Sequence, residues 1–412
     1  MKKASIVSIG NELLNGQTVN TNTTYLSSGL LSSGIPVVSS YIISDDVDAI
    51  IRVFDLAVAD ADIVLVTGGL GPTDDDLTRQ AFAGYLGTEL QLQADLLGRL
   101  ENFFTRRSLR MPDKNKIQAY IPAGAKPIEN SLGTAPGIMA EVKGKLIFAL
   151  PGVPSEMKRM FAESVLPELQ RFTGGQALVV RKLRCFGAGE STIAELLGAA
   201  CQRGRNPLVN CTVESGIITL HIIASSKEKN AARQMAEKEE KQIRNILGEL
   251  VYGTAEQSLA QVVGEKLTRK EKTLAVAESC TGGIVAKLLT DIPGASKYFT
   301  HGWITYSNAA KTAELGVAAD LIEKYGAVSE PVAQAMACCA RKKARSDFAI
   351  GITGIAGPDG GTEQKPVGLV YISVDSDNCC DTKRCLFSHD RQSIRIRAAQ
   401  TALNMLRLKL NI

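Results

Sequence analysis

Two segments in the C-terminal part of the chain carry residue types that could form a nucleophilic site. In TLAVAESCTGG, Ser279 follows an apolar run, and Gly282 and Gly283 come soon after it. In WITYSNAAKTAEL, Tyr306 and Lys311 lie five positions apart. A partly neutral lysine can take the proton of a serine hydroxyl, and a tyrosine hydroxyl can relay or orient that transfer. These residues indicate a base-activated serine nucleophile that needs no histidine.

Other interpretations of the same residues stay open. Ser279 or Thr281 could simply cap a helix, and this motif alone does not decide between capping and catalysis. Cys280 is a rival nucleophile by chemistry, although its place one residue further along would point it away from the direction of Ser279. The histidines stand in no recognisable motif and are interpreted as structural or surface residues: His221, His301 and His389.

A third segment of this region is a glycine-rich stretch, GITGIAGPDGGTEQKPVG, between two apolar runs. Unobstructed backbone of this kind can wrap closely around a phosphate or a flat ring, and Thr353 and Thr362 add hydroxyl donors. A plain flexible connection is the alternative. So many turn residues between buried strands favour a binding loop.

The candidate residues in the N-terminal region are carboxylates rather than basic side chains. TGGLGPTDDDLTR follows the apolar run DIVLVTGG, and it lacks the Gly-Lys-Ser/Thr ending of a P-loop. The carboxylates of residues 74–76 stand where a helix begins, so they could complement its dipole or hold a hard divalent cation. With Glu12 at the end of the first predicted strand, several carboxylates could converge on one edge of a sheet and bind a metal that bridges phosphates. Helix capping is the alternative.

Strands that alternate with helices must position these residues. KASIVSIG, VVSSYII and DIVLVTGG are predicted strands with helices between them, which indicates a parallel sheet. GIMAEVKGKLIFALPG predicts a hairpin turned by Lys143 and Gly144. After the predicted linker TGGQ, a strand, a helix, a strand and a long charged helix predict a small α+β module, and the charged helix is expected to present a solvated face. The α/β pattern then returns. We therefore predict an α/β protein with an α/β domain at 1–172, an α+β module at 176–251 and a second α/β domain at 256–412.

Length and composition narrow the function classes. The 412 residues exceed one ordinary core, and the net charge of +4 is too small to indicate a nucleic-acid surface. No apolar run approaches the roughly 20 residues of a membrane helix, and the start of the chain does not form a signal peptide. The nine cysteines form no CxxC pair, so we expect small buried residues in a reducing compartment. These features predict a cytoplasmic protein without nucleic-acid or membrane partners.

The motifs ESCTGG, YSNAAK and GITGIAGPDGGTEQKPVG together resemble the C-terminal domain of the CinA family of competence and damage-inducible proteins. That domain is similar to the stand-alone nicotinamide mononucleotide amidohydrolases. The resemblance implies deamidation of nicotinamide mononucleotide to nicotinate mononucleotide and ammonia, with Ser279 as nucleophile, Lys311 and Tyr306 as its activating partners, and no cofactor. The implied substrate-binding residues are Glu278, Thr281, Gly282, Gly283, Asn308, Thr353, Gly354, Gly357 and Gly361.

The motifs GNELLNG, TGGLGPTDDDLTR, NSLGTAPG and LPGVPSEM resemble the N-terminal domain of the same family, which is similar to the molybdopterin-binding fold. The resemblance implies a metal-dependent pyrophosphatase acting on ADP-ribose, with Mg2+, Mn2+ or Co2+ as the metal. The implied metal residues are Glu12, Asp75 and Asp76. The implied phosphate and nucleotide residues are Gly68, Gly69, Gly71, Thr73, Asn130, Gly133 and Thr134.

The middle module is similar to the KH-type domain of the family, but it lacks the GxxG loop with which nucleic-acid-binding KH domains clamp a backbone. RNA binding is therefore not expected. The resemblance as a whole implies a bifunctional hydrolase of pyridine-nucleotide salvage that acts as a homodimer. A non-enzymatic adaptor in competence or DNA repair is the alternative.

Overall fold

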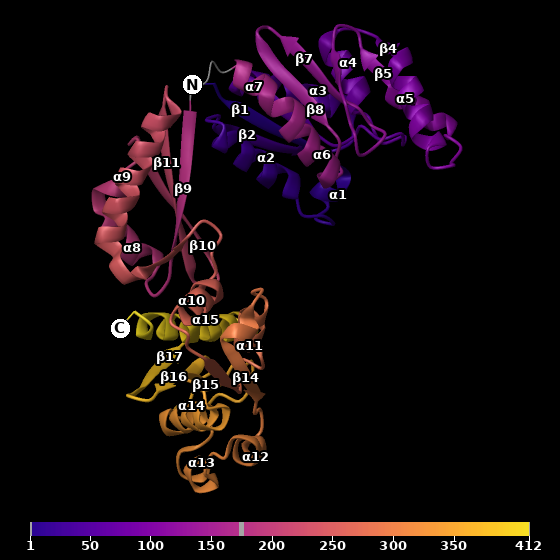
Figure 1. Ribbon diagram of the computed structural model, residues 1–412. Coiled ribbons are helices and arrows are strands. Elements are labelled where there is room, and N and C mark those ends of the chain that lie inside the picture. Colours follow the sequence, from indigo (N-terminus) through magenta and orange to yellow (C-terminus); the bar gives the residue numbers. More distant parts are fainter. Residues whose placement is uncertain (1, 173–176, 412) are drawn as a thin grey trace. The chain divides into compact units, whose positions relative to one another are not determined.

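The computed structural model describes residues 2–172 and 177–411 (Figure 1). The predicted linker TGGQ, residues 173–176, lies outside the described residues. The chain divides into two compact units, Met1–Val180 with Ala224–Met235, and Arg181–Ile223 with Ala236–Ile412. The fold is α/β, as the sequence predicts.

The N-terminal domain is built on a six-stranded sheet in the order β2-β1-β3-β8-β7-β6. The strands β1, β2, β3 and β8 run parallel, β7 is antiparallel to β8, and β6 is in turn antiparallel to β7. The strand bounds are Ala4–Ile9 (β1), Val37–Ile43 (β2), Ile63–Thr67 (β3), Lys126–Ile128 (β6), Gly137–Val142 (β7) and Lys145–Leu150 (β8). The predicted hairpin is the β7–β8 pair, and Lys143 and Gly144 turn it with positive φ angles of 51° and 74°.

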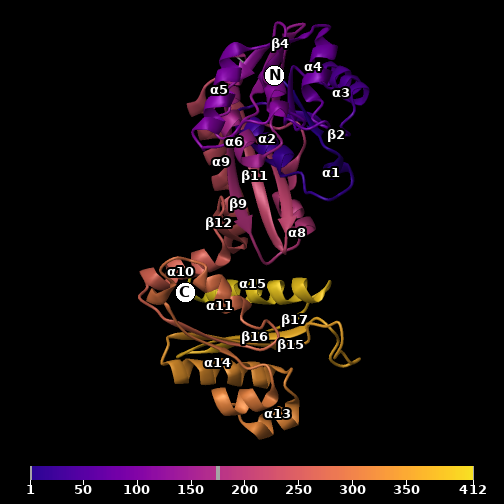
Figure 2. The same ribbon diagram turned by 90° about the vertical axis from the view of Figure 1, so that its right-hand side faces the viewer.

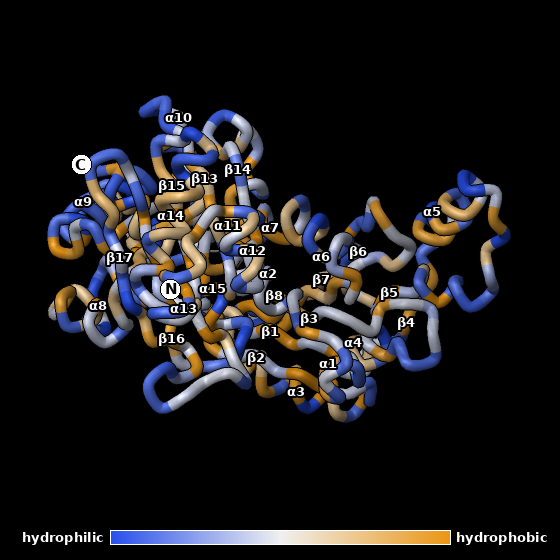
Figure 3. Tube along the Cα trace, turned by 90° about the horizontal axis from the view of Figure 1, so that it is seen from below, coloured by the Kyte–Doolittle hydropathy of each residue, from blue (hydrophilic) through white to orange (hydrophobic). Residues whose placement is uncertain are grey.

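Helices cover both faces of this sheet because side chains along a buried strand alternate between its faces. Ile6 of β1 packs with the core formed by α2 and α6, whereas its neighbour Val7 packs with the core under α3 and α4. Strand β3 is buried along its whole length. Figure 3 shows the hydropathy of each residue along the chain. The helices and smaller elements are α1 (Asn11–Leu14), α2 (Thr21–Ser32), α3 (Val47–Asp60), α4 (Thr78–Leu86), β4 (Leu90–Leu92), α5 (Ala94–Thr105), η1 (Asp113–Ala119), β5 (Tyr120–Pro122), α6 (Pro154–Met160), η2 (Phe161–Val165) and α7 (Leu166–Phe172).

The middle module is a four-stranded sheet in the order β10-β11-β9-β12 with helices α8 and α9. Apolar positions of α9 such as Ala236 and Ile243 are buried, and most of its charged residues face solvent, as the sequence predicts. Two strands of this module, β10 and β12, are not anticipated by the sequence analysis. The element bounds are β9 (Ala177–Cys185), α8 (Glu190–Leu197), η3 (Gly198–Cys201), β10 (Leu208–Glu214), β11 (Ile217–Ser226), α9 (Lys229–Leu247), η4 (Gly248–Leu250) and β12 (Val251–Thr254).

The C-terminal domain has a five-stranded sheet in the order β14-β13-β15-β16-β17, in which β13 is parallel to both of its neighbours. One face packs on α10 and α15, with Val276 and Leu403 in the same core, and the other face packs on α14, with Ala275 and Met336 in contact (Figure 2). The element bounds are α10 (Leu259–Arg269), β13 (Leu274–Glu278), α11 (Ile284–Thr290), η5 (Ala295–Lys297), β14 (Phe299–Ile304), α12 (Asn308–Ala310), η6 (Lys311–Leu315), α13 (Ala319–Tyr325), α14 (Glu330–Ala344), β15 (Phe348–Gly354), β16 (Leu369–Ser376), β17 (Cys380–Leu386) and α15 (Arg391–Lys409).

All nine cysteines are free thiols. The expectation that they are buried is right for Cys185, Cys280 and Cys385 and wrong for the other six, which are partly or fully exposed. Among the described residues, no helix is both long and apolar enough to cross a membrane.

Candidate functional site

Ser279 lies at the carboxyl end of β13, where three neighbouring parallel strands end together. Its backbone N–H donates to the carbonyl of Ile352 in β15 at 3.0 Å. On the other side, the N–H of Thr305, just after β14, donates to the carbonyl of Glu278 at 2.9 Å. Open α/β sheets bind their ligands at this edge, so the sheet holds Ser279 where a substrate is expected.

Lys311 lies beside this serine. Its Nζ is 3.1 Å from Ser279 Oγ and 2.9 Å from the carbonyl oxygen of Thr305. Only 1% of Lys311 is exposed, and it has no ion pair with any carboxylate in the described part of the chain. Burial lowers the pKa of Lys311, and the nearby Cys280 thiol offsets this only in part. A lysine of this kind can exist as a neutral amine and accept a proton from the serine.

The turn after Ser279 is held by Glu278 rather than left open. The fully buried carboxylate of Glu278 accepts hydrogen bonds from the backbone N–H groups of Gly283, Val285 and Ala286, at 2.9 to 3.1 Å. These three N–H groups are therefore already used and are not free to bind an anion. Glu278 therefore fixes the start of α11 rather than contacting a substrate. The turn requires a positive φ at Gly283, which is 95°.

Cys280 points away from Ser279, as expected, into the hydrophobic core. Burial raises the pKa of its thiol to about 12, which disfavours the nucleophilic thiolate. Arg395 of α15, which the sequence analysis did not single out, donates to the carbonyl oxygens of Cys280 and Thr281 at 3.1 and 2.7 Å. Arg395 therefore links the turn after Ser279 to α15. The buried hydroxyls of Thr281 and Thr305 have no partner among the described residues.

Tyr306 does not join the serine and lysine in this structure. It is 60% exposed, and its hydroxyl accepts a hydrogen bond from Arg391 at 2.9 Å. Arg391 also donates to the carbonyl of Gly357 at 2.5 Å, so it links Tyr306 to the glycine-rich loop. Asn308 is exposed at the start of α12.

The glycine-rich loop connects β15 to β16 beside the site. The Thr353 hydroxyl is buried and donates to the carbonyl of Ala327 at 2.7 Å, so it supports α13 and the following turn instead of facing a ligand. A Cβ on Gly354 would lie 2.7 Å from the carbonyl oxygen of Leu369. Only glycine therefore allows β15 and β16 to approach this closely here. Gly361 lies in the exposed part of the loop.

A cavity of about 480 Å3 lies at the carboxyl edge of the N-terminal sheet. It brings together eight of the predicted residues and adds Asp45, Asn22 and Glu156, which the sequence analysis did not assign to the site. The predicted residues that line it are Glu12, Gly68, Gly69, Gly71, Thr73, Asp75, Asp76 and Thr134. Asn130 and Gly133 line an adjoining cavity instead. Asp45 follows the carboxyl end of β2, so the rule that favours Glu12 could have found it.

The negative charges in this cavity affect the pKa of Asp45. Burial raises the pKa of Asp45, and the negative charges of Glu12, Asp75 and Asp76 raise it further, while a hydrogen bond from the backbone of Asn11 opposes them. Asp74 is not part of the group, because its carboxylate pairs with Lys114 at 3.0 Å outside the cavity.

Steric constraints explain why two positions of the N-terminal motif are glycines. A Cβ on Gly68 would lie 2.1 Å from the carbonyl oxygen of Ile9, so only glycine lets the ends of β1 and β3 meet. A Cβ on Gly71 would lie 2.3 Å from a carboxylate oxygen of Asp76, which also accepts a hydrogen bond from the backbone N–H of Thr73 at 2.8 Å. The loop therefore fits tightly around that carboxylate.

The donor set of the cavity suits a hard divalent cation. Within the described residues, no three Asp, Glu, His or Cys side chains are close enough to enclose a metal ion by themselves. Mg2+ is usually held by one or two carboxylates, waters and substrate phosphates rather than by an all-protein cage. Glu12, Asp75 and Asp76 line the cavity, but among the described residues they form no metal cluster by themselves, so a metal held together with waters and substrate phosphates stays a prediction.

The fold and the two sites define an α/β protein with a serine–lysine pair in one domain and a carboxylate-lined cavity in the other. Three family models match the chain: the probable molybdopterin binding domain at residues 5–171, the damage-inducible protein CinA KH domain at 180–253 and the CinA C-terminal domain at 256–410. The chain belongs to the CinA family of competence-damage inducible proteins. This confirms the family and the fold class that the sequence motifs imply.

Relatives support this membership over the full length. A protein from Caldicellulosiruptor saccharolyticus, named as a competence-damage inducible protein, is 43% identical over 404 residues, which are 98% of each chain. A CinA-like protein from Kosmotoga olearia is 41% identical, again over 98% of each chain. Among solved structures, the protein CinA from Thermoplasma acidophilum is 38% identical and covers 39% of this chain and 94% of its own, with a TM-score of 0.37.

Proposed function

We propose that the chain is a bifunctional hydrolase of pyridine-nucleotide salvage. Its C-terminal site would deamidate nicotinamide mononucleotide to nicotinate mononucleotide and ammonia. Its N-terminal site would hydrolyse ADP-ribose to AMP and ribose 5-phosphate with a divalent metal. The observation that carries the first activity is the buried Lys311 amine 3.1 Å from the hydroxyl of Ser279. The substrates come from the resemblance of the motifs to the family.

The C-terminal chemistry follows from this pair. Neutral Lys311 takes the proton of Ser279 Oγ as the oxygen attacks the carboxamide carbon. The C–N bond then breaks, and the protonated lysine returns its proton to the departing ammonia. Water, activated by the same amine, cleaves the resulting ester and releases the carboxylate and free Ser279. Tyr306 would take part only after its hydroxyl leaves Arg391, which substrate binding could bring about.

The N-terminal chemistry rests on charge. Among the described residues, no lysine or arginine lines the carboxylate cavity. Its five acidic residues are Glu12, Asp45, Asp75, Asp76 and Glu156. Such a cavity repels a pyrophosphate unless a cation neutralises both. Glu12, Asp75 and Asp76 would hold the metal, which would polarise the phosphoryl oxygens and neutralise their charge. The Gly68–Thr73 loop would present its backbone to the phosphates.

The deamidase proposal is tested by ammonia release from nicotinamide mononucleotide. The wild-type chain is expected to release ammonia, Ser279→Ala to release none above background, and Cys280→Ala to retain the wild-type rate. Equal release by the wild type and Ser279→Ala would show that the site is elsewhere. No release by any of the three would favour the adaptor role in competence or DNA repair.

A further inference from the structure

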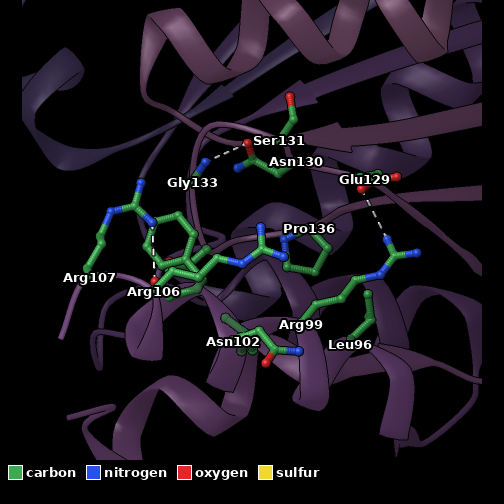
Figure 4. A pocket seen from close by; sticks show the side chains of 13 residues that line it. Leu96, Arg99, Asn102, Arg106, Arg107, Glu129, Asn130, Ser131, Gly133 and Pro136 are labelled. Carbon is green, nitrogen blue, oxygen red and sulfur yellow. Dashed lines mark hydrogen bonds and ion pairs between the residues drawn. The ribbon is translucent and has the colours of Figure 1, made fainter. Parts of the chain in front are cut away.

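A second cavity, of about 600 Å3, adjoins the carboxylate cavity in the N-terminal domain (Figure 4). One of its walls is formed by α5 and the residues after it, and the other by the segment from Glu129 to Pro136. This volume lies in the range of pockets that bind small molecules. The family resemblance assigns Asn130, Gly133 and Thr134 to a nucleotide pocket, but it gives no role to the α5 wall.

The α5 wall is strongly basic. Three guanidinium groups, those of Arg99, Arg106 and Arg107, line the cavity against the single carboxylate of Glu129. Arg99 lies 3.4 Å from Glu129, and both side chains are more than half exposed, so this ion pair is weak. The cavity therefore has the charge opposite to that of its neighbour.

Arg106 is the arginine that is free to bind. Its guanidinium makes no hydrogen bond or ion pair with any residue that the structure describes, and Figure 4 shows it extending across the cavity toward Pro136. Arg107 differs, because it stacks on the Phe103 ring at 3.6 Å and donates to the Phe103 carbonyl at 3.2 Å. An unpaired guanidinium in a cavity that two further arginines line suits a phosphate, which accepts two parallel hydrogen bonds from arginine.

The two cavities are joined by one ordered loop. Thr134 lines both of them. The Asn130 side chain donates to Glu156 at 2.7 Å and accepts from the backbone N–H of Gly133 at 2.9 Å. A Cβ on Gly133 would lie 2.3 Å from the Glu156 carboxylate. The loop is thus fixed between the two cavities, which share Thr134 as a lining residue.

We propose that the arginine cavity binds a phosphate monoester carried by the same nucleotide whose pyrophosphate lies in the carboxylate cavity. The proposal rests on the N-terminal activity proposed above and narrows its substrate class. ADP-ribose has no phosphate beyond its pyrophosphate, so it leaves the Arg106 guanidinium unpaired. A pyrophosphate-linked nucleotide with one more phosphate ester, such as 2′-phosphorylated ADP-ribose, satisfies both cavities.

The test is titration calorimetry of the full chain, with Mg2+ present, using analogues of ADP-ribose and of 2′-phosphorylated ADP-ribose in which a methylene group replaces the bridging pyrophosphate oxygen, so that neither is hydrolysed. The wild type is expected to bind the phosphorylated ligand about tenfold more tightly, the effect of one good charge-assisted contact. Arg106→Ala should abolish this preference. Arg110→Ala, which removes an exposed arginine of the same segment that does not line the cavity, should keep it.

Equal affinities of the two ligands for the wild type would overturn the proposal, as would equal effects of Arg106→Ala and Arg110→Ala, or no binding of either ligand. Hydrolysis is measured separately with metal added. Absence of ADP-ribose cleavage together with an Arg106-dependent preference would refute the pyrophosphatase and keep the phosphate site. Because the arginines are exposed, the preference should also shrink as salt is raised.

Discussion

At the residue scale, the central feature is a lysine taken out of water without a carboxylate to balance it. Lys311 meets only a carbonyl oxygen and a serine hydroxyl, at 2.9 and 3.1 Å. Burial disfavours the charged ammonium, and neither partner carries a charge that would restore it. The protein thereby favours the neutral amine and places it against the hydroxyl of Ser279.

A pH profile follows from this lowered pKa. Because the neutral amine is the active form, kcat/KM for ammonia release should rise with pH as Lys311 loses its proton. Burial lowers the pKa of Lys311, so the half-maximal point should lie below the ordinary lysine value of about 10.4. The measurement is kcat/KM of the wild type over a pH series. A flat profile, or a half-maximal point at or above the ordinary value, would contradict the role of Lys311.

The sequence identified this pair from residue types and order, but not its surroundings. ESCTGG and YSNAAK place a serine and a lysine at two strand ends, and parallel neighbours bring those ends together. The partner of Tyr306 could not be predicted, because Arg391 comes from a helix 85 positions later. Asp45 was missed for a simpler reason, since it stands outside any dense motif.

At the element scale, one carboxylate holds the turn that carries Ser279. Glu278 accepts three backbone N–H groups at the start of α11, where the helix dipole also favours a negative charge. Its full burial makes these bonds difficult to replace with water. Ser279 follows directly, so its orientation depends on this arrangement.

Glu278→Gln tests the arrangement. The variant keeps the shape but removes the charge and brings an NH2 group against N–H donors. Hydrogen bonds to a charged group contribute about 1.5 to 3 kcal/mol, so we expect the C-terminal domain to lose about 2 kcal/mol of unfolding free energy. Thermal unfolding followed by circular dichroism measures the change. Glu323→Gln, at an exposed position of α13, is the matched control, and equal melting of the two variants would refute the role of Glu278.

The sequence predicted the buried elements better than the edges. Strands such as β3 and β13 are continuous apolar runs because both faces are covered, and this pattern is readable. The edge strand β17, with the sequence CDTKRCL, was missed because its polar side chains resemble a loop until β16 pairs with it. The strand β10 was missed for the same reason.

At the scale of the whole molecule, the two candidate sites lie in different compact units, each with its own core. Each site is complete within its unit, because every residue assigned to it comes from that unit. Neither chemistry requires a group from the other site. Assembly into a homodimer stays a prediction.

Paired variants test this independence. Asp76→Ala should abolish metal-dependent cleavage of ADP-ribose and leave ammonia release from nicotinamide mononucleotide unchanged. Ser279→Ala should do the reverse. Both activities are measured on the same full-length preparations, and circular dichroism establishes that each preparation is folded. Loss of both activities in a folded single variant would mean that the sites are coupled.

The most direct test of the account is Lys311→Met, which removes the amine and fills its place with an uncharged side chain of similar length. General-base catalysis contributes about a hundredfold to ten-thousandfold, so ammonia release from nicotinamide mononucleotide should fall by at least about a hundredfold. The melting temperature should not fall, because a buried amine is removed. Lys342→Met, at an exposed position of α14, should retain the wild-type rate. A folded Lys311→Met variant that releases ammonia at the wild-type rate would contradict the serine–lysine mechanism.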